Sequence, residues 1–347
     1  MNSSRQWIIV TIVLGLAVVA PAYARVANGF DLAGSLVPAR EIRAGGPPRD
    51  GIPALTDPPR LSAQDADGWL MADDRVMGLV VGGEAVAYPV RILNWHEIVN
   101  DIVGGRPVVV TYCPLCGTGI VFDARVGGQR AFFGVSGLLY KSDVLLFDRA
   151  TESLFSQILM KAVTGPLRGT ELTALPAVST TWEAWRRKHP DTRVLSHVLP
   201  YGRDYGTDPY RLYRRSGTTL YHVRGADKSR GTKEWAYLVL AREKKILIAE
   251  ADLLEAAKGE ARRFTVAEGV VLHYDPESRE LSALGGPTSE WIVIPGYWFA
   301  LTAFHPDAHR IGPEGLVWAT TVPQRFQRAR NPLVSRWTKG PRCGFSL

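Results

Sequence analysis

Short apolar runs alternate with turn residues along most of the chain, and long helical patterns are scarce. The alternation is typical of strands, which are predicted at residues 76–81, 85–90, 107–112, 118–122, 130–134 and 144–147. Three short helices are predicted at residues 91–99, 180–188 and 253–257. The second begins at Thr180, which has capping-box spacing with Glu183. The pattern therefore predicts an α+β, strand-dominated fold with few short helices.

The order of the predicted elements occurs twice along the chain. A strand pair at 79–88, a short helix and two more strands are followed, later in the sequence, by the same order beginning at residue 238. This suggests two β-rich halves related by a degenerate internal repeat, although the residues themselves are only faintly similar. In this alignment the turn 113–119 of the first half corresponds to residues 267–269 of the second. In this interpretation the first half carries a chemical site and the second half has only a structural role.

The two ends of the chain differ from the part between them. Arg5, an apolar run over residues 7–19 and the small-residue motif Ala22-Tyr23-Ala24 predict a signal peptide at 1–24, and hence a periplasmic or secreted protein. That run is shorter than the roughly 20 residues that span a bilayer, so no stable membrane span is expected after cleavage.

The predicted organisation of the rest follows from composition. A Pro-, Gly- and Arg-rich stretch predicts an extended irregular segment, and a similar stretch predicts an irregular tail. The core between them is divided into a first half, a bridging segment and a second half. The boundaries are 25–61 for the irregular segment, 62–306 for the core (62–160, 161–233 and 234–306 in turn) and 307–347 for the tail.

Charge and cysteine content limit the function. The 41 basic and 34 acidic residues leave a net charge of +7, but they are interspersed rather than gathered in blocks, which argues against nucleic acid as a partner. Three cysteines cannot form a disulfide framework in 347 residues. The partners are otherwise unknown from the sequence.

The pair Cys113 and Cys116 is the strongest chemical signal. It lies in a turn between two predicted strands, where a Cys-x-x-Cys-Gly knuckle can direct both sulfurs at one metal ion. Two thiolates are half of a tetrahedral site, and His96, on the helix before the first of those strands, is the nearest further ligand. Sulfur with imidazole suits copper or zinc.

Two other interpretations of the cysteine pair stay open. An oxidising compartment favours a Cys113–Cys116 disulfide, which closes too short a loop to contribute much stability. Thiol redox chemistry usually needs such a pair at a helix N-terminus, whereas here the following residues predict a strand. Cys343, in the irregular tail, is interpreted as a spare thiol.

Several polar residues near the cysteines are candidates for a pocket. Asn100 is expected one helical turn after His96, and residues 133–143 are interpreted as a turn carrying hydroxyl groups. Polar residues then alternate with large apolar ones, which predicts strands with one wet face. The pocket candidates are Asn100, Tyr140, Ser142, Asp143, Asp148, Glu152 and Gln157, and the alternative is an ordinary solvated sheet. The Gly134–Gly137 stretch lacks the spacing of a serine-hydrolase elbow.

The motifs also form a familiar set. In order, they are Trp95-His96-Glu97-Ile98-Val99-Asn100-Asp101, Tyr112-Cys113-Pro114-Leu115-Cys116-Gly117-Thr118, Phe133-Gly134-Val135-Ser136-Gly137-Leu138-Leu139-Tyr140, Ser142-Asp143 with Asp148-Arg149, and Thr180-Thr181-Trp182. Together they resemble the domain-of-unknown-function 3179 family of bacteria and archaea, over about residues 65–305. The resemblance implies no established reaction. Lys141, Phe147 and Phe155 depart from the residues usual in the family.

The leading hypothesis is an exported protein that binds a transition metal at Cys113, Cys116 and His96, with electron transfer, oxidation or metal delivery as its use. A non-catalytic binding or structural module with bridged cysteines is the second hypothesis. The third is an enzyme that uses Asp143, Asp148 and Glu152 without a metal. Whether the protein is an enzyme is left open by the sequence.

Overall fold

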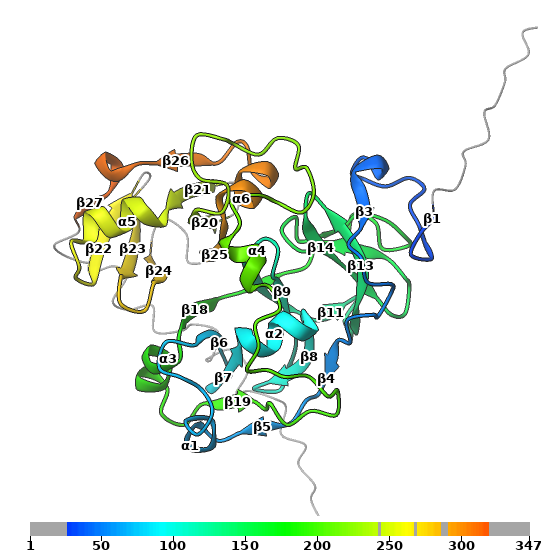
Figure 1. Ribbon diagram of the computed structural model, residues 1–347, viewed down its shortest axis with the longest axis horizontal. Coiled ribbons are helices and arrows are strands. Elements are labelled where there is room, and N and C mark those ends of the chain that lie inside the picture. The colour runs from blue at the N-terminus through cyan, green and yellow to red at the C-terminus, as the bar shows by residue number, and fades with distance from the viewer. Residues whose placement is uncertain (1–25, 242–243, 267–268, 286–290, 319–347) are drawn as a thin grey trace, which may run out of the picture.

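The computed structural model describes residues 26–241, 244–266, 269–285 and 291–318 (Figure 1). The predicted signal peptide and Cys343 lie outside these residues. Strands dominate the described part, and six short α-helices accompany them, which confirms the predicted α+β class. None of the described helices has the length and apolar character needed to cross a membrane.

The first half is built on a hairpin, a helix and a three-stranded meander. The hairpin and helix are β6 (Arg75–Val81), β7 (Glu84–Pro89) and α2 (Val90–His96), and the meander is β8 (Ile98–Val103), β9 (Arg106–Cys113) and β10 (Thr118–Asp123). The hairpin sheet is completed by β18 (Ala177–Thr181), α3 (Trp182–Lys188) and β19 (Arg193–Leu195), and β19 pairs parallel with β7.

The second half repeats this order. Its hairpin, helix and meander are β20 (Trp235–Ala241), β21 (Lys244–Ala249), α5 (Glu250–Ala257), β22 (Arg262–Val266), β23 (Val270–Asp275) and β24 (Glu280–Gly285). Completing elements follow as β25 (Ile292–Tyr297), α6 (Trp298–Phe304) and β26 (His309–Ile311). The sheet order β25-β20-β21-β26 matches β18-β6-β7-β19, including the parallel last pair. The predicted internal repeat is therefore confirmed.

One strand changes the predicted alignment of the halves. The helix expected over 91–99 ends at His96, because Glu97 has a φ of +57°, and the next six residues form β8. Asn100 is therefore on a strand and not on a helix face with His96. With β8 counted, β9 and β10 correspond to β23 and β24, so the equivalent of the cysteine turn is residues 276–279 rather than 267–269.

The corrected alignment matches two turns of equal length. Cys113 and Cys116 correspond to Asp275 and Ser278, whose side chains are hydrogen-bonded at 2.8 Å. Gly117 and Arg279 are equivalent and both are left-handed, with φ of +66° and +50°. The two turns thus have the same backbone shape, but the side-chain atoms at the equivalent positions are sulfur in the first half and oxygen in the second.

Another sheet, called here the third sheet, is formed by four strands that lie between the two meanders in sequence and by one strand, β3 (Ile42–Ala44), that precedes them. Its order is β16-β15-β14-β13-β3, from β16 (Lys161–Ala162), β15 (Leu154–Ser156), β14 (Asp143–Asp148), β13 (Phe133–Tyr140) and β3. The turn expected at 133–143 is thus mostly strand β13, with a register shift between Val135 and Leu138. All eight residues of β13 are buried, so the expected wet face is absent there.

The expected irregular segment and tail contribute edge strands. β4 (Leu55–Thr56) pairs with β8, β5 (Arg60–Leu61) pairs with β19, and β27 (Val317–Trp318) pairs with β22. Phe30 and Ile42 are buried in the core against the third sheet. The short elements that complete the described chain are β1 (Val26–Ala27), β2 (Phe30–Asp31), a 3₁₀ turn at Ala39–Glu41, α1 (Ala63–Ala66), β11 (Arg125–Val126), β12 (Gln129–Arg130), β17 (Ala174–Leu175), α4 (Arg211–Arg215) and a 3₁₀ turn at Pro313–Gly315.

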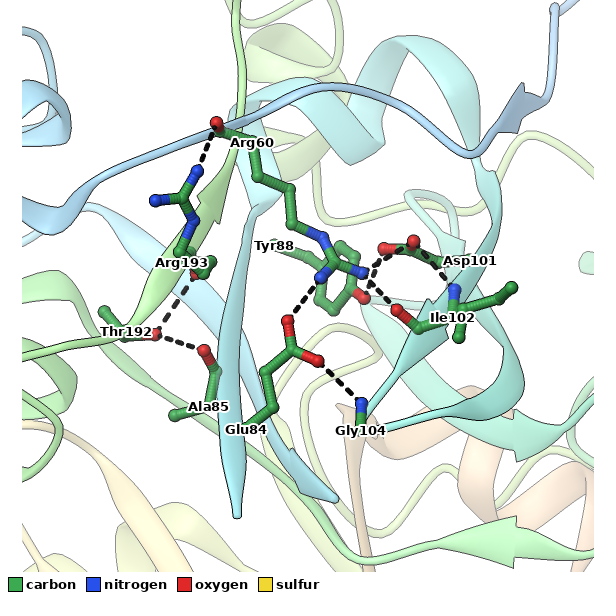
Figure 2. A network of polar contacts seen from close by, with 9 residues as sticks. All are labelled: Arg60, Glu84, Ala85, Tyr88, Asp101, Ile102, Gly104, Thr192 and Arg193. Atoms are coloured by element: carbon green, nitrogen blue, oxygen red, sulfur yellow. Dashed lines mark hydrogen bonds and ion pairs between the residues drawn. The ribbon is translucent and has the colours of Figure 1, made fainter. Parts of the chain in front are cut away.

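A polar network ties the N-terminal segment to the first half (Figure 2). The Arg60 guanidinium forms ion pairs of 2.6 Å with both Asp101 of β8 and Glu84 of β7. Tyr88 donates to Asp101 at 2.8 Å, and Glu84 accepts the Gly104 amide at 2.6 Å. Because the Asp101 side chain is almost fully buried, this network fixes β5, β7 and β8 more firmly than an exposed ion pair would.

The halves pack reciprocally. β10 of the first half lies against β25 of the second, and β24 of the second lies against β18 of the first. The part of the predicted bridging segment that carries α4 runs between α2 and β25 (Figure 1). Predicted α3 starts two residues later than expected, because Thr181 rather than Thr180 caps it by accepting from the Ala184 amide. This arrangement places the cysteine turn at the junction of the two halves.

Candidate metal centre

The cysteine turn is closed at the end of the β9–β10 hairpin. The Cys116 amide donates to the Cys113 carbonyl at 3.2 Å, and Gly117 takes the left-handed conformation that ends the turn. A Cβ atom at Gly117 would lie 2.6 Å from the Trp235 ring, so the position has no room for a side chain. Both cysteines are buried free thiols. The structure therefore contains the predicted strand–turn–strand knuckle in its reduced form.

A second turn brings oxygen atoms to the two sulfurs. Lys141 and Ser142, both left-handed, connect β13 to β14 and place the Ser142 carbonyl opposite the cysteine turn. The Cys113 and Cys116 thiols donate to this carbonyl at 3.6 and 3.2 Å. A carboxylate oxygen of Asp143 and the two sulfurs all lie within 4.8 Å of one another. Three atoms able to bind a metal thus converge in the protein interior.

Burial keeps this cluster protonated in the absence of a cation. Desolvation raises the pKa of Asp143 to about 8, and the amides of Ile158 and Val144 offset it only in part. Desolvation likewise raises the pKa of the Cys113 thiol and, further, that of the Cys116 thiol. Glu97, also buried, has its pKa raised to about 8 by desolvation and by Asp143. A cation would offset the cost of ionising these acids by pairing with them.

One oxygen of Asp143 is free to take a ligand. Oδ2 accepts the Ile158 amide at 3.1 Å, whereas Oδ1 accepts no hydrogen bond of normal geometry within the described chain. A buried carboxylate oxygen without a partner is uncommon in folded proteins. After the Ile158 and Val144 amides, the Cys113 thiol and the Thr118 hydroxyl also favour the charged form of Asp143 and so lower its pKa.

Gln157 holds the hairpin in place beneath the cluster. Its Oε1 accepts the Thr118 hydroxyl at 2.7 Å, and its Nε2 donates to the Thr111 hydroxyl at 2.9 Å. Gln157 follows β15 of the third sheet, while the two threonines lie on β9 and β10. This predicted pocket residue is therefore a buried link between the sheets that carry the two converging turns.

The turn is also held from the bridging segment and from the second half. The Tyr213 hydroxyl of α4 donates to the Leu115 carbonyl at 2.8 Å. The Tyr297 amide, at the end of β25, donates to the Cys116 carbonyl at 2.8 Å. Formation of the site thus requires the folding of both halves together.

His96 is not part of the cluster, which corrects the predicted ligand set. Its Nδ1 donates to the Pro53 carbonyl at 2.7 Å, and its Nε2 accepts the Tyr205 hydroxyl at 2.6 Å. Both ring nitrogens are therefore occupied, and burial lowers the pKa of the ring, which keeps it neutral. The third atom near the two sulfurs comes from Asp143 instead.

The other pocket candidates are dispersed. Asn100 clamps β8 to β4 and β13, with its amide donating to the Leu55 and Phe133 carbonyls and its oxygen accepting the Phe133 amide. Asp148 caps its own turn by accepting from Thr151. Glu152 is exposed and pairs with Arg49 at 2.8 Å, and Tyr140 packs edge-on against Phe304. These four residues do not line a common pocket with Ser142, Asp143 and Gln157.

Glu97 was missed by the sequence reasoning. It was grouped with His96 on a helix, but its left-handed backbone turns the chain so that its carbonyl accepts the Tyr112 amide, one residue before Cys113. Its buried carboxyl lies close enough to Asp143 and Cys113 to affect their pKa values. A carboxylate between His96 and Ile98, near the end of a predicted helix, was the only signal in the sequence.

Two hollows border the cluster from opposite sides. A cavity of about 640 Å³ is lined by residues that flank the cysteines, namely Tyr112 and Gly117, and by Tyr297. A smaller pocket of about 100 Å³ is lined by Ser142, whose buried hydroxyl has no partner, together with several basic residues. The buried cluster thus lies next to two hollows, each lined by a residue of the converging turns.

The donor set suits a transition metal. Two thiolates and one carboxylate match the ligand types of zinc, and donor atoms around a tetrahedral zinc ion lie roughly 3 to 4 Å apart, which the observed spacing allows after small adjustments. The hard carboxylate oxygen fits monovalent copper less well. Cys113, Cys116 and Asp143 would hold the ion, which would supply Lewis acidity or act as a structural clamp.

Comparison with known proteins places the chain in a family. The family described as "Protein of unknown function (DUF3179)" matches residues 49–308, and the chain belongs to it. No curated protein and no solved structure matches the chain. The resemblance drawn from the motifs is therefore confirmed, and the family description assigns no activity.

Proposed function

We propose that this protein is an exported, metal-binding protein of the cell envelope whose ion is held by Cys113, Cys116 and Asp143. The observation that supports this best is the convergence of two buried sulfurs and an unpartnered carboxylate oxygen from separate hairpins. A hydrophobic core gains nothing from three such acids, since burying them costs free energy unless a cation or protons neutralise them. Export is inferred from residues 1–24.

Zinc is the metal that this ligand set favours, and copper is the alternative. A redox function would require copper, because zinc has no accessible second oxidation state. Metal analysis of the purified protein therefore tests the presence of the site and its redox capacity together.

The experiment is metal analysis by mass spectrometry of protein purified from the periplasm, with N-terminal sequencing to test signal cleavage. We expect about one equivalent of metal in the wild type and in His96→Gln, and less than about a tenth of that in the double variant Cys113→Ser, Cys116→Ser. Asp143→Asn should also lose most of its metal. Cys343→Ser is the matched control because it removes a thiol outside the cluster. Equal metal content in the wild type and the double variant would contradict the proposal.

The competing function is a structural module with a Cys113–Cys116 disulfide. The two thiols share one acceptor, the Ser142 carbonyl, so they are near enough to be oxidised together. Thiol counting in denatured, unreduced protein separates the two cases. A disulfide leaves one free thiol of the three cysteines, whereas a metal centre leaves all three.

A further inference from the structure

The cavity of about 640 Å³ lies between the two repeats, and we call it the central cavity. Its walls are made by equivalent positions of the two halves. At three such pairs the first half contributes a polar residue and the second an apolar one: Arg75 with Trp235, Asn94 with Leu254, and Ser179 with Pro295. These three residues of the second half form an apolar wall, while charged residues of the same half, among them Glu250 and Arg279, also line the cavity.

The charges of Arg75, Arg279 and Glu250 do not balance. Arg279 forms an ion pair with Glu250, and Glu250 also accepts the Tyr237 hydroxyl at 2.8 Å. Arg75 donates instead to three neutral oxygens, the Ser278 carbonyl at 2.5 Å, the Ser179 hydroxyl at 2.9 Å and the Arg279 carbonyl at 3.5 Å. Within the described chain no carboxylate lies within 4.0 Å of the Arg75 guanidinium, so this group carries one uncompensated positive charge.

Burial makes that charge unfavourable as it stands. Desolvation and the neighbouring Arg279 both lower the pKa of Arg75, although an arginine keeps its proton in proteins. Arg75 is partly buried, and removing a cation from water costs free energy unless an anion pairs with it. An anion in the central cavity would supply the missing pair.

The other charges of the wall do not cancel this surplus. Arg91 is paired with Asp74 at 3.0 Å, and Arg214 is paired with Asp208 at 2.6 Å. Asp73 is exposed at the rim.

Lys233, at the roof of the cavity, adds a second cation without a carboxylate. It donates to the Ser216 hydroxyl at 2.9 Å, and its ammonium lies 3.3 Å from the centre of the Tyr213 ring. Lys233 also donates to the carbonyls of Tyr213 and Ser216, so all these contacts are with neutral groups. The cavity is lined by five cationic and five carboxylate side chains, and Arg75 and Lys233 are the two cations of this lining with no carboxylate within 4.0 Å in the described chain.

Aromatic rings form much of the remaining surface. Trp235 and Tyr297 meet edge to face with ring centres 5.5 Å apart, and Tyr112 lies on the same side. Small-molecule sites commonly have volumes of roughly 300 to 1,000 Å³, apolar walls and a few fixed polar groups. The central cavity has all three properties.

We propose that the central cavity binds an organic anion, with its acidic group at Arg75 and its apolar or aromatic body against Trp235. Carboxylates, phosphates and sulfonates share the chemistry that Arg75 would recognise. The proposal concerns a site separate from the metal centre and does not depend on it.

The probe is 8-anilinonaphthalene-1-sulfonate, an aromatic anion that fluoresces when bound, and N-phenyl-1-naphthylamine is its uncharged counterpart. Titration of the folded, full-length protein at pH 7.5 should show one sulfonate site, with an affinity at least about tenfold above that of the uncharged probe. Arg75→Gln should lower the sulfonate affinity by about tenfold or more and leave the uncharged probe unaffected. Arg75→Lys should retain part of the affinity.

Two further variants keep the test decisive. Leu254→Glu places a negative charge on the exposed edge of the apolar wall and should weaken sulfonate binding even if Arg75→Gln fails to fold. Arg125→Gln alters an exposed ion pair with Asp123 outside the cavity and should change nothing. The Cys113→Ser, Cys116→Ser variant should still bind the sulfonate, which separates this site from the metal centre. Absence of sulfonate binding, equal affinity for both probes, or normal binding by Arg75→Gln would overturn the proposal.

Discussion

His305 is expected to make the protein sensitive to mild acid. It ends α6 and is only 7% exposed, and neither ring nitrogen has a hydrogen-bond partner of normal geometry within the described chain. Burial, with a smaller effect from Lys245, lowers the pKa of His305 to about 4. The unfolded chain binds a proton on this ring near pH 6.5, whereas the folded protein does so only near pH 4.

The sign and size of the effect follow from this difference. Between pH 6.5 and 4 the unfolded state binds more protons on this ring than the folded state, so the contribution of His305 to the free energy of unfolding falls as the pH falls. A shift from 6.5 to about 4 corresponds to about 3 kcal/mol when fully expressed, of which about 2.5 kcal/mol is lost at pH 4.5. Above about pH 7.5 the ring is neutral in both states, so His305 causes no loss of stability there.

The test compares wild type with His305→Leu by urea denaturation at pH 7.5 and 4.5. The variant removes the titrating ring and should be about 2.5 kcal/mol less sensitive than wild type to the change in pH. His309→Gln is the control, because His309 is an exposed histidine nearby. If the difference between wild type and His305→Leu were the same at both pH values, the ring would not be held neutral by burial, and the reasoning would be wrong.

Three more predictions concern the site and its supports. Gly117→Ala should lower the free energy of unfolding, measured in urea melts, by about 1 to 2 kcal/mol because of the left-handed backbone alone, and by more because the new Cβ clashes with Trp235. Gly128 is also left-handed but has open space around it, so Gly128→Ala should show only the backbone effect. Asn100→Ala should cost about 2 to 3 kcal/mol in the same assay, because it removes a partner from three buried backbone groups of two strands, β4 and β13. In the metal-free protein Asp143 and Glu97 should each contribute a loss of stability as the pH rises from 4 to 8, since the folded protein retains their protons up to about pH 8, and this contribution is opposite in sign to that of His305. Asp143→Asn should remove the Asp143 part of that dependence in urea melts, and an unchanged slope in the variant would contradict the assignment.

The two turns of the repeat explain why only the first half carries the candidate metal centre. The turn at Asp275 and Ser278 satisfies its own donor and acceptor internally, so it is complete without a ligand. Cys113 and Cys116 have instead a shared carbonyl and a carboxylate from another sheet. The same backbone thus serves as a closed turn in one half and as a converging set of ligands in the other.

Local patterns were sufficient for the class of the fold. The alternation that predicted strands at 76–81 and 118–122 reflects side chains on opposite faces of a strand, a property of a few consecutive residues. The repeat was detectable from these local patterns too, because the predicted elements follow one another in the same order in both halves. β8 was missed, since Glu97 ends the helix by a backbone conformation that no periodicity shows.

The cysteine pair could be found from the sequence because its two ligands are three residues apart. Asp143 was named as a pocket candidate, but its contact with the sulfurs joins a different hairpin and depends on the packing of two sheets. His96 is nearer in sequence, yet its ring is turned toward Tyr205 by the end of α2. The sequence alone therefore determined the strand-rich repeat and the reactive turn, through interactions between close neighbours. Tertiary structure alone decided the third ligand and the central cavity, because both arise where segments far apart in the chain are brought together.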